Sequence, residues 1–260
     1  MHTSAWRRFS ALYIKELREL RPEIVIVVAA AVLICLTLFG KSGTSERNLF
    51  IFPIFLLMGL AGFLPFVATF KLLGREWSSN TIYLIMSLPA GGGLILGAKL
   101  TALISQYLLG TLVVIVSAFV WVYPHLPELV QSLNSMTGSG MQLVQFIPAI
   151  AMAYLLSLTW LFYLISASFL SQLISKLFNR FNGVITLIAF IIVLILGGWL
   201  MEIPRSLINA SSSFNIIGPN IISSLQQAIL FMGINSVIYF IVAWLIILTS
   251  ILIYNYKIEL

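Results

Sequence analysis

Long runs without a charged residue dominate the order of polar and apolar positions along the chain. Six such runs cover residues 24–40, 49–70, 100–123, 146–174, 182–201 and 228–256. A helix needs about 20 mostly apolar residues to cross the hydrocarbon core of a bilayer, where its backbone groups must be hydrogen-bonded internally. None of the runs has the regular polar alternation of a barrel strand. The pattern predicts an all-α, polytopic membrane protein with six transmembrane helices.

The composition supports this class. Of the 260 residues, 60% are hydrophobic and 8% charged, against about 45–50% and about 25% in a soluble domain. Cys35 is the only cysteine, which excludes an internal disulfide and a cysteine-based zinc site. The formal net charge of +6 is distributed between the apolar runs, so it indicates membrane topology and gives no reason to expect nucleic-acid binding.

The distribution of lysine and arginine predicts the orientation. Lys41, Arg47 and Arg205 lie in segments on one side of the membrane, and the other 11 of the 14 basic residues lie on the opposite side. Basic residues accumulate in cytoplasmic loops. We therefore expect both termini in the cytoplasm and a multi-pass protein of the cell membrane, most simply a bacterial plasma membrane.

Residues 1–23 precede the six-helix domain of residues 24–260 and predict an amphipathic elbow helix. Its apolar side chains recur at the three- and four-residue spacing of one helix face: Trp6, Phe9, Tyr13, Leu17 and Leu20. The remaining face is mostly basic: Arg7, Arg8, Lys15, Arg18 and Glu19. We expect this helix to lie in the cytoplasmic interface with its basic side toward anionic membrane lipids, and to end at Pro22. It either only anchors the chain or also contacts a cytoplasmic partner.

The chain has few residues that could act in catalysis or bind a metal. The two histidines are His2 and His125, no carboxylate pair falls within a run, and no hydrolase or zinc-protease motif occurs. Gly92 and Gly97 have the spacing of a phosphate-binding loop, but Ala98 stands before Lys99, so the motif fails. The sequence predicts no catalytic residue, metal site or cofactor in this chain. It predicts instead that another helix packs against Gly93 and Gly97, which have the spacing of a small-residue contact surface.

The longest cytoplasmic connection, residues 71–99, should be structured. Ser78, Ser79 and Asn80 are candidate helix caps, and residues 81–88 predict a short helix ended by Pro89. We expect this helix to lie against the membrane domain and to present Arg75, Glu76 and Trp77 to the cytosol. With so few charges in the chain, the sequence gives no basis for ion-pair arguments.

At this loop the sequence resembles the permease subunit of ATP-binding-cassette exporters of the type-2 permease family. The family's acidic residue, threonine, leucines, Leu-Pro pair and lysine have counterparts in the same order: Glu76, Thr81, Leu84, Leu88, Pro89 and Lys99. The chain departs from the family at three places. Asn80 stands at the usual glycine, Tyr83 where an acidic residue is common, and Gly91 and Gly92 at a polar or basic pair.

The resemblance implies transport rather than chemistry. Two permease subunits, identical or different, would pair with two cytoplasmic ATPase subunits that bind ATP and Mg²⁺ and perform the hydrolysis. The residues implied to couple to the ATPase are Arg75, Glu76, Trp77, Ser78, Ser79, Asn80 and Thr81. The family also often has re-entrant helices between the last two spans, and residues 202–227 fit that length; the alternative is an ordinary external loop on the bilayer.

The only indication of the cargo is the low polarity of the predicted membrane helices. The uncharged, aromatic-rich helices favour an apolar or amphiphilic substrate such as a drug, peptide or lipid. A polar stripe near the end of the fourth run is a candidate substrate path: Ser168, Ser171, Gln172 and Ser175. Its alternative role is hydrogen bonding within or between membrane helices. A stand-alone secondary transporter or channel, an intramembrane enzyme, and a membrane adaptor that recruits an ATPase are the competing functions.

Overall fold

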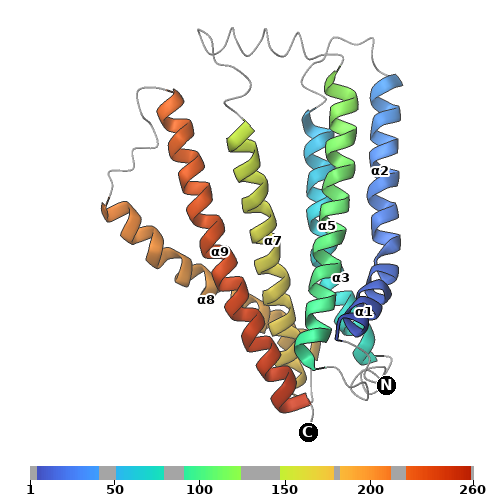
Figure 1. Cartoon of the computed structure of the whole chain (residues 1–260), viewed down its shortest axis with the longest axis vertical. Helices are drawn as coiled ribbons and strands as arrows, with labels where there is room; N and C mark the ends of the chain where they lie inside the picture. Colours follow the sequence, from blue (N-terminus) through green and yellow to red (C-terminus); the bar gives the residue numbers. More distant parts are fainter. Residues whose placement is uncertain are drawn as a thin grey trace. The chain divides into compact units, whose positions relative to one another are not determined.

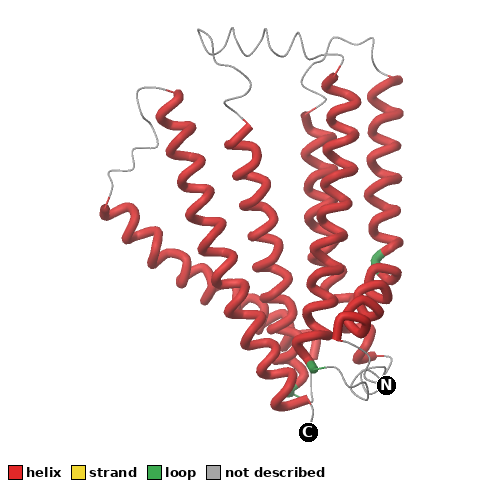
Figure 2. Tube along the Cα trace, in the orientation of Figure 1, coloured by secondary structure: helices red, strands yellow, loops and turns green. Residues whose placement is uncertain are grey.

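The computed structural model describes residues 5–40, 51–78, 91–123, 147–178, 182–211 and 221–258. Within them the chain forms seven helices and no strand (Figures 1 and 2). The helices are α1 (Ala5–Glu19), α2 (Arg21–Gly40), α3 (Ile51–Ser78), α5 (Gly92–Val122), α7 (Ile147–Lys176), α8 (Asn182–Ser211) and α9 (Ile221–Ile258). The all-helical prediction is confirmed for this part of the chain.

Four helices are long and apolar enough to cross a membrane. Their candidate spans are Pro53–Glu76, Gly92–Val120, Ile147–Lys176 and Ala228–Tyr256, and Gly183–Trp199 is a shorter apolar helix. These four agree with four of the six predicted spans and indicate a membrane protein. The runs at 24–40 and 182–201 lie in α2 and α8, and their crossing of the membrane, like the cytoplasmic position of the termini, stays a prediction.

The helices form two compact units, residues 1–139 and 140–260. In the first unit, α1, α2 and α3 all pack against α5. Its apolar core consists of Val27 and Ala31 of α2, Leu57 and Ala61 of α3, and Val114 of α5. A Cβ atom added at Gly110 would lie 3.3 Å from the Cβ of Ala61, so α3 and α5 approach closely where α5 has a glycine.

In the second unit, α7 packs against both α8 and α9. The hydroxyl of Tyr163 on α7 donates to the carbonyl of Val193 on α8 at 3.3 Å. Its ring lies over Gly197, where an added Cβ would be only 2.0 Å from the Tyr163 hydroxyl oxygen. On the α9 side, the ring of Trp160 meets Tyr239 edge-on, with centroids 4.9 Å apart.

The turn between α1 and α2 corrects the predicted end of the elbow helix. Helix α1 ends at Glu19, and Pro22 is already the second residue of α2. Proline is tolerated in the first turn of a helix because its missing N–H has no helical acceptor there. The Leu20 N–H donates to the Glu16 carbonyl at 3.1 Å and the Ile24 N–H to the Leu20 carbonyl at 3.2 Å, so the turn is tight and Leu20 is buried.

Both ends of the connection predicted over residues 71–99 belong to the neighbouring helices. Residues 71–78 continue α3, and residues 92–99 already belong to α5. Ser78 is therefore the last residue of α3 and does not begin a new helix. The charges at 71–76 suggested the end of a helix, but Leu72 and Leu73 between them are buried and continue the packed face. The short helix predicted over 81–88 lies outside the described residues.

The other predicted boundaries shift by fewer residues, except at α8. This helix continues to Ser211, ten residues beyond the predicted end of the fifth span, and α9 begins at Ile221. The segment 202–227, predicted as re-entrant or as an external loop, thus starts as the last part of α8 and finishes as the first part of α9. Residues 212–220 between them lie outside the described part of the chain.

Candidate functional site

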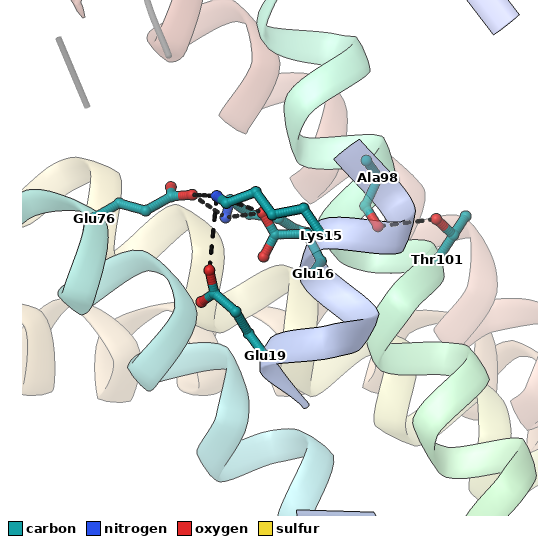
Figure 3. A network of polar contacts seen from close by, with 7 residues as sticks. Lys15, Glu16, Glu19, Glu76, Ala98 and Thr101 are labelled. Carbon is teal, nitrogen blue, oxygen red and sulfur yellow. Dashed lines mark hydrogen bonds and ion pairs between the residues drawn. The ribbon is translucent and has the colours of Figure 1, made fainter. Parts of the chain in front are cut away.

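Four charged side chains of the first unit form a closed ring of ion pairs, here called the charge ring. It consists of Lys15 and Glu16 of α1, Glu76 of α3 and Lys99 of α5. The Lys99 ammonium lies 2.7 Å from Glu76 and 3.0 Å from Glu16, and the Lys15 ammonium lies 3.1 Å and 3.3 Å from the same carboxylates. Positive and negative groups alternate, and Glu19 approaches Lys15 from outside at 3.9 Å (Figure 3).

The ring lies where three helices meet. Glu76 is near the last turn of α3 and Lys99 is in the second turn of α5, so the pair joins the two helices that flank residues 79–90. Glu16 faces α5 from α1, next to Lys15 in sequence. The ring therefore links the helices on either side of this segment to each other and to the elbow helix.

Burial makes the alternation of charge necessary. The Lys99 side chain is 2% exposed and both glutamates are nearly as buried, whereas Lys15 is 43% exposed. Removing charges from water costs several kcal/mol per ion unless opposite charges and hydrogen bonds compensate. Here each carboxylate has two ammonium neighbours and each ammonium two carboxylates. The ring is neutral as a whole, and loss of any member would leave a buried net charge.

The pKa of Lys15 is shifted by the neighbouring members of the charge ring. Partial burial by itself would lower the pKa, but the nearby carboxylates of Glu16 and Glu76 outweigh that effect, and the pKa is raised above 10.5. Lys15 therefore carries its positive charge throughout the neutral pH range.

Aromatic and hydroxyl contacts position α1 on α5 beside the ring. The rings of Trp6, Phe9 and Tyr13 stack in succession, with centroid separations of 5.9 and 6.5 Å. Phe9 lies about a van der Waals distance from the place of a Cβ at Gly97, and the Tyr13 hydroxyl donates to Ser105 at 3.0 Å. The predicted apolar face of the elbow thus packs partly against protein.

Hydroxyl groups continue this contact along α5. The Ser105 hydroxyl donates to the Thr101 carbonyl at 2.8 Å, and the Thr101 hydroxyl donates to the carbonyls of Gly97 and Ala98 (Figure 3). A second ion pair, between Lys71 of α3 and Glu23 of α2, joins the next pair of helices. Polar contacts thus link all four helices of the first unit near the ring.

The predicted coupling residues have different surroundings. Arg75 is exposed at the end of α3, and its presentation to the cytosol stays a prediction. Glu76, expected to face the cytosol, is buried because Lys15 and Lys99 neutralise it. Trp77 and Ser78 belong to α3, but their side chains lie outside the described residues, as do Ser79, Asn80 and Thr81.

The sequence reasoning missed the ring and wrongly treated ion pairs as unimportant. One signal was available. Glu16 lies three residues after Tyr13 and four before Leu20, on the apolar face of α1, where an acidic residue needs a cationic partner. Lys99 was assigned only to topology and to the loop motif. Its pairing with Glu16 depends on a contact between elements 83 positions apart, which no local pattern predicts.

The polar stripe of α7 is buried and hydrogen-bonded to its own helix. The hydroxyls of Ser168, Ser171 and Ser175 donate to the carbonyls of Leu164, Ser168 and Gln172 at 2.8 to 2.9 Å. Gln172 is buried with them. Serine hydroxyls in a membrane helix can form their hydrogen bonds with carbonyls of the preceding turn. Hydrogen bonding of this kind is the alternative to a role in a substrate path.

The buried amide of Gln106, in the first unit, has no such hydrogen bond within the described part of the chain. Gln106, on α5 between Lys99 and Gly110, is 3% exposed, and neither its amide nitrogen nor its oxygen has a hydrogen-bond partner. An unpaired buried amide destabilises a fold by about 1–3 kcal/mol. The structure gives no compensating contact for it.

Comparisons with protein-family models, with curated proteins and with solved structures find no match for this chain.

Proposed function

We propose that this chain is the transmembrane permease subunit of an ATP-binding-cassette exporter in a bacterial plasma membrane. A separate ATPase subunit hydrolyses ATP, and a second permease subunit completes the transport unit. The cargo is an apolar or amphiphilic molecule. The proposal combines a helical chain with at least four candidate membrane spans with the loop motif that resembles the type-2 permease family.

The contact between Glu76 and Lys99 carries the proposal. In the resembling motif these are the acidic residue that opens the loop and the lysine that follows it, and in this chain the two are bonded at 2.7 Å. A segment that transmits movement from an ATPase must be held firmly at both ends, because otherwise the force bends the loop and does not reach the spans. A buried ion pair between the flanking helices supplies such a support.

The absence of chemical groups in the predicted spans agrees with this role. A permease needs only surfaces that move, whereas an intramembrane enzyme or a proton-driven carrier needs ionisable groups at its centre. The six runs contain no Asp, Glu, Lys or Arg. Four charged side chains of the first unit instead meet in the charge ring between α1, α3 and α5.

The test is co-expression with an ATPase encoded beside this chain, followed by purification in mild detergent and measurement of ATP hydrolysis. We expect a stable complex, and we expect Arg75→Glu to weaken it, because the exposed end of α3 adjoins the proposed contact. Lys176→Glu, which changes charge at the end of α7, is the matched control. If the chain purifies without the ATPase and leaves its hydrolysis unchanged, a stand-alone secondary transporter becomes the better hypothesis.

The polar stripe of α7 is tested separately in the assembled complex. If Ser168, Ser171, Gln172 and Ser175 line the substrate path, Gln172→Leu should change cargo transport while the complex stays intact. Unchanged transport by a stable complex would assign the stripe to helix packing alone.

A further inference from the structure

The two glutamates of α1 lie, together with Lys15, on the side of the helix that carries the charge ring. Glu16 is buried in the charge ring and Glu19 turns toward Lys15. Arg7 and Arg18 are exposed and lie 11 positions apart, about three helical turns, and Arg21 is exposed at the start of α2. These three residues are here called the arginine stripe.

The lysines and arginines of this region have different roles. Lys15, Lys71 and Lys99 each contact a carboxylate of the first unit. The three residues of the arginine stripe are exposed. Their guanidinium groups can bind phosphate oxygens through two parallel hydrogen bonds.

The position of α1 relates this stripe to a membrane surface. Phe9 lies beside Gly97 and Tyr13 bonds Ser105. Both partners lie inside the candidate span Gly92–Val120, so α1 packs on the N-terminal half of a helix apolar enough to enter a bilayer. Trp6 is 74% exposed and Ile14, between the arginines, is 45% exposed. Exposed tryptophan and isoleucine among arginines are typical of a helix at the headgroup level.

We propose that anionic phospholipid headgroups bind the arginine stripe and that the charge ring transmits this binding to the ends of α3 and α5. Lipid phosphates hold α1 from outside while Glu16 and Lys15 hold it from inside. Movement of α1 away from α5 would leave Lys99 with Glu76 as its only ring partner. Anionic lipid therefore stabilises the arrangement that fixes both ends of residues 79–90.

The first experiment measures lipid binding on the full chain in detergent. Phosphatidylglycerol should raise the unfolding temperature by roughly 5 °C relative to phosphatidylcholine, because a ligand of the native state stabilises it. Each arginine near an anionic surface contributes about fivefold in affinity, so replacing all three by glutamine should weaken binding roughly a hundredfold and abolish the shift. Arg18→Gln alone should reduce the temperature shift, whereas Lys176→Gln, which removes one charge on α7, should leave the shift unchanged.

The second experiment measures transmission. Gly74 and Gly91 have open space around an added side chain, so spin labels at Gly74→Cys and Gly91→Cys, with Cys35→Ser, report the separation of the loop ends. In nanodiscs, phosphatidylglycerol should give a narrower distance distribution than phosphatidylcholine. Glu16→Gln should keep the lipid-dependent rise in unfolding temperature but lose the narrowing.

Three results would overturn the proposal. Equal unfolding temperatures in phosphatidylglycerol and phosphatidylcholine would exclude selectivity for anionic lipid. An unchanged temperature rise in the triple arginine variant would show that the lipid binds at another site. Persistent narrowing in Glu16→Gln would exclude transmission through the ring. A response to polyglutamate but not to lipid would reassign the stripe to an acidic protein partner. No ATPase is involved, so the outcome is independent of the proposed function.

Discussion

The Lys99 ammonium lies 2.7 Å from the Glu76 carboxylate although the two residues are 23 positions apart in the sequence. The pair closes the connection between α3 and α5 with a buried bond of opposite charges. Because Glu16 and Lys15 complete the ring, the same bond also determines where the elbow helix lies. One lysine thus holds three helices at a single point.

Replacing Lys99 by methionine should destabilise the first unit by about 3–5 kcal/mol, because the two buried carboxylates of Glu16 and Glu76 would lose the ammonium group that lies between them. The measurement is unfolding of the purified chain in detergent as a function of temperature or denaturant. Lys99→Arg keeps the charge and should cost much less.

A double substitution separates the ion pair from simple packing. Glu76→Gln together with Lys99→Met removes one charge of each sign, so its cost should be smaller than the sum of the two single costs. Lys71→Met is the matched control, since Lys71 is about half exposed and bonds one carboxylate. Additive costs at Glu76 and Lys99 would contradict a direct electrostatic contact.

The contribution of Lys15 should depend on pH only under alkaline conditions. Its pKa in the folded chain is raised above 10.5 by Glu16 and Glu76 despite partial burial. A raised pKa means that the stabilisation is fully present below the ordinary value and is lost as the pH rises through the folded value. The difference in unfolding temperature between the wild type and Lys15→Met should be constant from pH 6 to about pH 9 and decrease above about pH 10.5. A decrease already near neutral pH would contradict the raised pKa.

The helical class was predictable from the sequence because long charge-free runs have few other structures available in a membrane. Helix ends were less predictable. The prediction ended the second span at the first charge, Lys71, but α3 continues to Ser78. Charge marks the end of a lipid-facing helix only when the charge must reach water, and Glu76 instead finds Lys99 inside the protein.

Only two residues of the charge ring could be connected with function from the sequence. Glu76 and Lys99 were both noted in the loop motif, but as contacts for a partner or as topology signals. Glu16 was overlooked because the pattern of α1 was read from its apolar positions. Pairing among these residues is set by how α1 packs on α5, where Phe9 meets Gly97 and Tyr13 meets Ser105. Such packing follows from tertiary structure and not from periodicity.

Replacing Gln106 by leucine should stabilise the chain by about 1–3 kcal/mol. Both polar atoms of this buried amide lack partners, and an apolar side chain of similar size removes that cost. Gln226→Leu, at an exposed position near the start of α9, is the control and should change stability by no more than about 0.5 kcal/mol. A loss of stability in Gln106→Leu would show that the amide has a partner in the membrane. Higher stability with lower transport would indicate that Gln106 serves function.

Gly197→Ala should disrupt the packing of α7 on α8. The new Cβ would lie 2.0 Å from the Tyr163 hydroxyl oxygen and 2.8 Å from its Cζ, so the ring must move and its hydroxyl must leave the carbonyls of Val193 and Leu194. Overpacking of this kind costs about 1–3 kcal/mol or more. The neighbouring Gly198→Ala meets no atom within 4 Å and should be neutral or stabilise α8 by up to about 1 kcal/mol, since alanine favours helix.

The unfolding temperatures of Gly197→Ala and Gly198→Ala should therefore shift in opposite directions or differ clearly. Adding Tyr163→Leu to Gly197→Ala should recover part of the loss, because a shorter side chain vacates the space. Equal behaviour of the two alanine variants would mean that Tyr163 does not lie over Gly197 in the membrane.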